Sequence, residues 1–164
     1  MKTLALTLTC LMTCISVFGQ VQEAKFSGEA ALLNEDGTLT MLQNDFGSLS
    51  MSFNVSTNGE SSTVKIQARE TIQIVVKASN INESPAKMIV AFKMKQKKGK
   101  RIASMGAYGV KSKDIIHFKG DTYGESSYIL TFENLEPGEY GIWYGDKFVK
   151  NSLGEHPMAF FCID

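Results

Sequence analysis

Residues 135–144 have the sequence Leu-Glu-Pro-Gly-Glu-Tyr-Gly-Ile-Trp-Tyr, a tight turn followed at once by a β-strand pattern. Proline presets φ at the second turn position, and glycine accepts the positive φ that a type II turn needs next. The flanking segments alternate with the period of two that is typical of a strand with one buried face, at Tyr128, Leu130 and Phe132 and again at Tyr140, Ile142 and Tyr144. The sequence therefore predicts two strands joined by a sharp turn.

Tyr140 lies two residues after Gly138, where its hydroxyl can return to the backbone of the turn. This arrangement resembles the tyrosine corner between strands E and F of immunoglobulin-like sandwiches. Many short alternating segments and frequent Gly, Asn and Ser turns predict an all-β, antiparallel immunoglobulin-like β-sandwich of about eight or more strands. We expect its core to contain Ile74, Val76, Val90, Phe92, Leu130, Phe132, Tyr140 and Ile142.

The rest of the chain supplies the other strands and turns. Asp36-Gly37 between apolar runs predicts a hairpin, and residues 72–76 predict a central strand. Alternation predicts one strand over residues 48–55 and a last strand at 158–164. Glycine within polar residues predicts a hairpin tip at 95–101 and a turn at 120–125. The loop at 57–62 is the one plausible internal domain boundary.

Length and charge limit the possible classes of protein. With 164 residues and 43% hydrophobic content, the chain can form one domain with a substantial core, here residues 20–164. Lysine plus arginine equals aspartate plus glutamate at 17 each, so no overall field draws nucleic acid or an anionic membrane. We expect no specific binding of nucleic acid.

Residues 1–19 have the form of a secretory signal peptide, with Lys2 ahead of an apolar run that ends in Val17-Phe18-Gly19, and we expect cleavage after Gly19. The run is too short for a good transmembrane helix, and no later segment has the ~20 apolar residues of a span. The protein is therefore expected in the periplasm, at the cell surface or outside the cell. An alternative is a lipid anchor at Cys14, with Thr13 where Gly or Ala is usual.

Cleavage would remove Cys10 and Cys14 and leave Cys162 alone. An unpaired thiol in an exported protein suggests an intermolecular bond or a reactive group. The alternative, which we favour, is a buried small hydrophobic residue between Phe161 and Ile163.

Three segments resemble a set of small exported proteins of Bacteroidetes-type bacteria: residues 95–101, residues 123–128, and the Leu-x-Pro-Gly-Glu-Tyr turn with the strand that ends the chain. Members of that set often end in Gly-Ile-Asp or Gly-Val-Asp, and here Cys162 stands where glycine often occurs. The likeness covers roughly the last 100 residues and the signal peptide. It implies export and a β-sandwich, and it implies no activity.

Residues suited to catalysis are sparse. His117 and His156 are far apart in the sequence and lack the spacing of zinc ligands. No Gly-x-Ser-x-Gly elbow or Gly-rich phosphate loop is present, and Cys162 stands on an apolar strand instead of beside a base. We therefore expect no enzyme activity, no metal and no cofactor.

The most unusual surface feature of the sequence is a basic hairpin, which places six cations in nine residues of a chain that is otherwise acidic: Lys93, Lys95, Lys97, Lys98, Lys100 and Arg101. It could dock an anionic partner, or its lysines could protect a protruding strand edge from aggregation. Trp143 is a second candidate, because the pleat turns it away from Tyr140. There it could stack on a sugar, or it could pack beneath the loop around Phe148.

These features favour an exported, non-catalytic module that binds an envelope glycan or another anionic partner. The alternative is a structural protein that joins partners through exposed strand edges such as the last strand.

Overall fold

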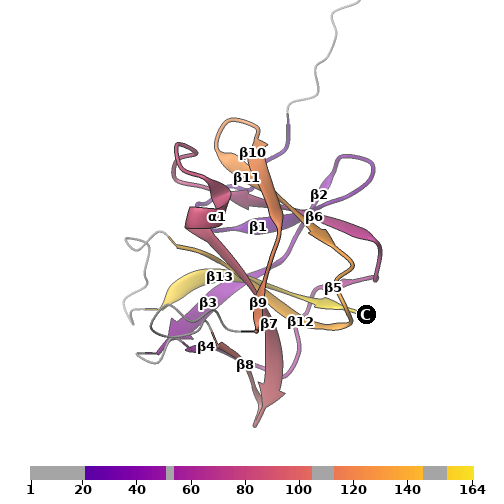
Figure 1. The fold of residues 1–164 in the computed structure, drawn as a ribbon, viewed down its shortest axis with the longest axis vertical. Coiled ribbons are helices and arrows are strands. Elements are labelled where there is room, and N and C mark those ends of the chain that lie inside the picture. The colour runs from indigo at the N-terminus through magenta and orange to yellow at the C-terminus, as the bar shows by residue number, and fades with distance from the viewer. Residues whose placement is uncertain (1–20, 51–53, 105–112, 146–154) are drawn as a thin grey trace, which may run out of the picture.

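The computed structural model describes residues 21–50, 54–104, 113–145 and 155–164 (Figure 1). These residues form thirteen β-strands and one short helix. The elements are β1 (Ala30–Leu33), β2 (Leu39–Met41), β3 (Gln43–Leu49), β4 (Asn54–Asn58), β5 (Lys65–Ile66), β6 (Thr71–Lys77), α1 (Pro85–Met88), β7 (Ile89–Lys97), β8 (Lys100–Ser104), β9 (Ile115–Ile116), β10 (Lys119–Tyr123), β11 (Ser127–Glu133), β12 (Gly138–Tyr144) and β13 (His156–Ile163).

The first sheet has five antiparallel strands in the order β10-β11-β6-β1-β2. Its middle strand is β6, in which Ile72, Ile74 and Val76 are buried. The central strand predicted at residues 72–76 is therefore confirmed. The hairpin predicted around Asp36-Gly37 is also confirmed, since Leu33 pairs with Leu39 across it.

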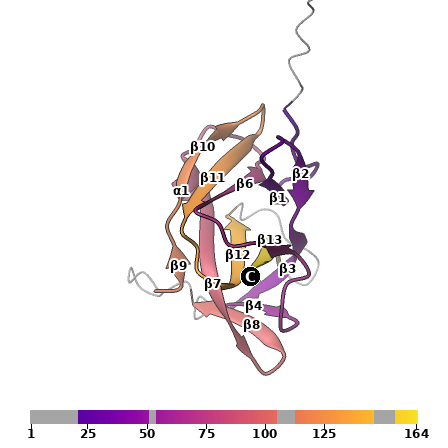
Figure 2. The same cartoon turned by 90° about the vertical axis from the view of Figure 1, so that its right-hand side faces the viewer.

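The second sheet closes on itself. Its strands follow the order β12-β13-β3-β4-β8-β7, and β7 pairs again with β12, so six antiparallel strands form a barrel. The barrel lies below the five-stranded sheet (Figures 1 and 2). The all-β fold is confirmed, but a closed barrel takes the place of the open second layer that an immunoglobulin-like sandwich would have.

Two glycines make room inside the barrel. A Cβ atom on Gly141 of β12 would lie 2.3 Å from the Phe92 ring, and one on Gly47 of β3 would lie 2.5 Å from the Met158 sulfur. Both distances are shorter than van der Waals contact allows. The interior of a small barrel fills with side chains from all of its strands, so large residues on one strand need small ones opposite.

The fold has two separate cores. The main core lies between the five-stranded sheet and the barrel, and the second core fills the barrel with Val55, Phe92, Met94, Ala103, Met158 and Phe160. Six of the predicted core residues are buried in the main core: Ile74, Val76, Leu130, Phe132, Tyr140 and Ile142. Phe92 belongs instead to the second core, and Val90 is only half-buried against it. The prediction that all eight share one core was therefore wrong.

The corner at residues 135–144 connects the two sheets. The Tyr140 hydroxyl donates a hydrogen bond to the Glu136 carbonyl oxygen at 2.6 Å, and Gly138 has a φ of +145°. The Tyr140 ring is buried and stacks on Phe161, with 5.3 Å between ring centroids. The predicted return of this hydroxyl to the turn is confirmed.

Two predicted elements differ from the structure. Residues 48–55 form no single strand, because β3 ends at Leu49 and β4 returns beside it, pairing Leu49 with Val55. A tight hairpin keeps the period of two through both of its arms, so the sequence pattern looks continuous; Met51 and Phe53 of that prediction lie outside the described residues. The turn predicted at 120–125 is mostly strand β10, an exposed edge strand whose polar residues show no alternation.

The loop at 57–62 does not divide the sheets between two halves of the chain. Strands that precede it and strands that follow it contribute to both sheets. Residues 1–20, with the predicted signal peptide and Cys14, lie outside the described part of the chain.

Candidate functional site

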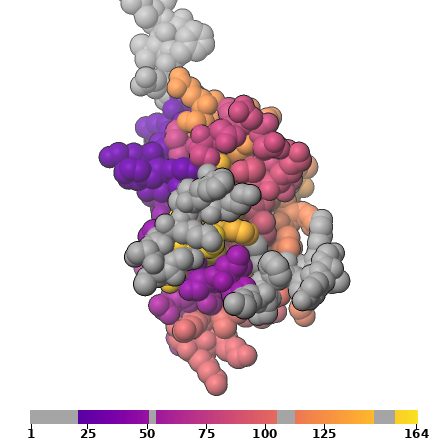
Figure 3. Space-filling view, turned by 90° about the vertical axis from the view of Figure 1, so that its left-hand side faces the viewer, coloured from indigo at the N-terminus to yellow at the C-terminus, as the bar shows by residue number. Residues whose placement is uncertain are grey.

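The β7–β8 hairpin projects from the far end of the barrel (Figures 1 and 3). Its two-residue turn is Lys98-Gly99, with φ values of +51° and +74°. Two positive φ values suit the right-handed twist of a hairpin, and Asn or Asp is the usual first residue because most side chains resist this conformation. The hairpin predicted at 95–101 is confirmed, with an unusual lysine at its bend.

The six predicted cations do not share one surface. Lys93 and Lys95, near the base of the hairpin, each have a carboxylate partner: Lys93 Nζ lies 2.8 Å from Glu136 Oε2, and Lys95 Nζ lies 3.0 Å from Asp114 Oδ1. The hydrogen bond that Lys93 donates to Glu136 raises the pKa of Lys93, and the same contact lowers the pKa of Glu136. Burial alone would raise the pKa of Asp114, but bonds from the Ser104 amide and Lys95 outweigh it and lower that pKa. These charges are already neutralised within the protein.

Arg101 is not on the surface at all. Its side chain is 0% exposed, its guanidinium lies over the Phe160 ring at 4.9 Å, and Nη1 lies 3.3 Å from Glu139 Oε2. Glu139 also accepts hydrogen bonds from the Ser61 hydroxyl and the Ser62 amide. The prediction that Arg101 contributes to a partner-binding surface was therefore wrong, because this residue is an internal link between β8, β12 and the loop at 61–62.

Sequence reasoning missed Glu139. Glu139 is next to Tyr140 in a strand, so the pleat places its carboxylate on the face opposite the main core. In most sheets that face is exposed to solvent. The barrel covers that face. The one available signal was that Glu139 is a charged residue within a strand of aromatic, apolar and glycine residues.

Lys97, Lys98 and Lys100 are exposed at the tip, and we call them the tip lysines. Among the described residues, no carboxylate oxygen lies within 4.0 Å of any of their ammonium nitrogens, whereas eight other cation–carboxylate pairs meet that limit. Lys97 pairs directly with Lys100 across the two strands. Like charges in that position repel each other and destabilise a hairpin. The tip thus holds three uncompensated charges close together.

Trp143 faces the barrel, opposite Tyr140, as the pleat predicted. Its ring meets His156 edge-on at 5.4 Å and packs against the second core, and its Nε1 atom is buried. Trp143 pairs with Val90 of β7, whereas the tip begins at Lys97 of the same strand. At the usual rise per residue of a strand, Val90 and Lys97 are roughly 23 Å apart. The structure therefore does not bring Trp143 and the tip lysines into one site. The Phe148 loop, the alternative cover for Trp143, lies outside the described residues.

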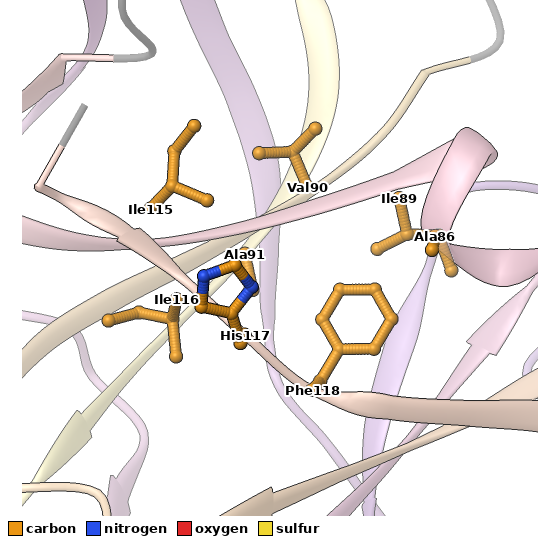
Figure 4. A pocket seen from close by; sticks show the side chains of 8 residues that line it. All are labelled: Ala86, Ile89, Val90, Ala91, Ile115, Ile116, His117 and Phe118. Atoms are coloured by element: carbon orange, nitrogen blue, oxygen red, sulfur yellow. The ribbon is translucent and has the colours of Figure 1, made fainter. Parts of the chain in front are cut away.

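A pocket of about 230 Å³ opens where the chain leaves β9 and enters β10 (Figure 4). Its walls come from β7, from β9 and the segment that follows it, and from α1. Residues that line it include Ala86, Val90, Ile115, Ile116, His117 and Phe118. His117 is the one titratable side chain in the lining, and it follows β9 instead of lying within a strand.

The remaining candidate residues occupy ordinary structural positions. His156 is buried at the start of β13. The Cys162 thiol is half-buried; burial, with the nearby Glu139, raises its pKa to about 11, so it stays protonated at neutral pH. Across the described ranges, no three His, Cys, Asp or Glu side chains gather as a metal site would require. No helix in those ranges is both long and apolar enough to cross a membrane.

No family model, no curated protein and no solved structure matches this chain.

Proposed function

We propose that this protein is an exported, non-catalytic binding module that holds an anionic partner, such as an envelope glycan, at the tip lysines. The observation that carries the proposal is the uncompensated charge of Lys97, Lys98 and Lys100 on a projecting hairpin. The form of the signal peptide and the likeness to exported Bacteroidetes-type proteins support the exported location.

Two local costs favour binding over simple edge protection. Lys98 occupies a positive-φ position that suits Asn or Gly better, and Lys97 faces a like charge in Lys100. Natural sequences depart from local rules mostly at functional sites. Edge protection also needs few lysines, because in the described ranges β8 pairs with β4 as far as Lys100 and β7 pairs with β12 as far as Met94, so the edge left open is short, residues 95–97.

The alternative function, assembly through strand edges, has less support. The last strand, β13, has β12 on one side and β3 and β5 on the other, so its paired residues offer no free edge. The five-stranded sheet ends in β2 and β10, and β10 carries Lys119 and Asp121, charged residues of the kind that discourage strand addition. Self-assembly would give oligomers in light scattering without any ligand.

The test is retention on heparin and on envelope polysaccharide at low and high salt. We expect the parent to be retained at low salt and released as salt rises, because exposed charges are screened beyond about 8 Å at physiological ionic strength. Changing Lys97, Lys98 and Lys100 together to Gln should abolish retention.

A matched control changes Lys65, Lys87 and Lys119 to Gln. These lysines are also exposed, but each has a carboxylate partner. The control alters net charge by the same amount and should keep most of the retention. Equal loss in both triple variants would show a general charge effect and contradict the proposal.

A further inference from the structure

The pocket beside β9 has a structural origin that is independent of the tip lysines. β9 pairs with β7 over two residues only, Ile115 with Phe92 and Ile116 with Ala91, and the chain then crosses to the five-stranded sheet. Beyond that point, no strand in the described ranges pairs with Val90 on this side of β7. The crossing segment diverges from β7 there and, together with α1, borders the opening of Figure 4.

The walls of the pocket are held in place. Ile89 and Ala91 at its floor are 2% and 3% exposed and belong to the main core. The Phe118 ring packs against Phe132 of β11, with 5.8 Å between ring centroids. A ligand therefore meets a largely preformed apolar surface and has little to reorganise, which lowers the cost of binding.

The lining is half-exposed in a way that the fold does not require. Val90, Ile115, Ile116 and Phe118 are apolar side chains that remain partly open to solvent. Covering them would remove apolar surface from water, which is favourable in proportion to the area covered. A concave apolar surface with a single convergent polar group is the usual form of a small-molecule site.

Size and chemistry together narrow the ligand class. This pocket is open to solvent on one side, and its volume of about 230 Å³ exceeds that of an enclosed apolar cavity of about 150 Å³ that accepts benzene, so one aromatic ring with a small substituent fits within it. A neutral imidazole offers one donor and one acceptor, and so does a phenolic hydroxyl. A charged substituent on the ligand would lose hydrating water against the apolar wall, which costs free energy. A neutral hydroxyl avoids most of this desolvation cost.

We propose that this pocket binds a free monocyclic phenol, with its ring against Ala91, Ile116 and Phe118 and its hydroxyl hydrogen-bonded to His117. The proposal does not depend on the function of the tip lysines, since the pocket shares no residue with them.

The test is titration of the isotopically labelled protein with p-cresol, followed by the amide NMR signals of residues 86–91 and 115–118. We expect shifts confined to these residues. His117→Ala should weaken p-cresol about two- to tenfold, the effect of one lost hydrogen bond, and should leave the weaker binding of toluene unchanged. Both His117 and Ala86 are exposed, so neither change threatens the fold.

Ala86→Phe should fill the pocket and abolish the shifts from both compounds. Lys87→Ala, the next residue of α1, does not line the pocket and should bind like the parent. The proposal is overturned if p-cresol leaves the pocket amides unshifted up to its solubility limit, or if folded Ala86→Phe binds p-cresol as the parent does. Parental p-cresol affinity in His117→Ala would overturn the assigned hydrogen bond.

Discussion

The base and the tip of the β7–β8 hairpin carry the same type of side chain in opposite circumstances. Toward the base, Lys93 and Lys95 each lie within 3.0 Å of a carboxylate oxygen, and Arg101, one residue from the tip, is wholly buried with a carboxylate oxygen at 3.3 Å. At the tip, the described structure places no carboxylate near Lys97, Lys98 or Lys100. A run of cations in a sequence therefore says little about a surface until the partner of each charge is known.

The difference follows from how charges are stabilised. A buried cation needs a partner, because removing a charge from water costs several kcal/mol. An exposed cation keeps its water and needs none, so within this hairpin it is the tip that has charge left to offer a partner molecule. The predictions below test this contrast in order of expected effect.

The largest effect should come from Glu139→Gln, which leaves the Arg101 charge buried without a counter-charge. We expect the free energy of unfolding to fall by about 3–5 kcal/mol, the usual cost of breaking a buried pair from one side. Urea unfolding followed by fluorescence measures it. Adding Arg101→Met to that variant should restore much of the loss, because no unpaired charge remains. If the single variant unfolds like the parent, the pair is not a structural requirement.

Lys77, a paired cation remote from the hairpin, extends the contrast to the pH dependence of stability through its partner Glu23. Burial alone would raise the pKa of Glu23, but hydrogen bonds from Lys77 and from the Ser126 amide and hydroxyl outweigh it and lower the pKa to about 2. A carboxylate whose folded pKa lies below its unfolded value of 4.5 stabilises the fold above that value. The stabilisation is then lost as pH falls toward 2.

Glu23→Gln should therefore cost about 1.5–3 kcal/mol at pH 7, as charged hydrogen bonds do. The difference from the parent should be flat between pH 6 and 8 and should shrink below pH 4.5. Denaturant unfolding at a series of pH values provides the measurement. A difference that grows on acidification would contradict the assigned ionised state.

Tyr140→Phe tests the neutral hydrogen bond beside the base of the hairpin. The hydroxyl bonds the Glu136 carbonyl at 2.6 Å, so its removal should cost about 0.5–1.5 kcal/mol and still permit folding. Differential scanning calorimetry would show a lower Tm with an unchanged shape of transition. A Tm equal to that of the parent would mean that the bond contributes nothing in solution.

The smallest effect on stability should come from the tip itself. Replacing Lys97, Lys98 and Lys100 together with Gln should change the free energy of unfolding by less than about 0.5 kcal/mol, or slightly increase it, because the charges repel one another. Raising the salt concentration should stabilise the parent more than the variant. A large destabilisation would show that the tip lysines have partners in solution and would weaken the contrast.

Much of the local structure was predictable because turns and strands have short-range signals. Asp36-Gly37, Lys98-Gly99 and Pro137-Gly138 each occur where a turn is found, and alternating residues located β6, β11, β12 and β13. The candidate site was only partly predictable. The pattern located the hairpin and its lysines, but it gave no means of separating Arg101 from Lys100, its neighbour in the sequence.

The sequence by itself determined the all-β class, the tyrosine corner and the face of β12 that enters the main core, because these depend on residues close together in the chain. Only the tertiary structure decided what covers the other face. Closure of the barrel rests on the pairing of β7 with β12, whose paired residues are about 50 apart in the chain, as are Phe92 and Gly141. That pairing makes Glu139 of β12 and Arg101 of β8 internal, because it closes the barrel over the face of each strand that carries them. No local period encodes which distant strand will lie alongside.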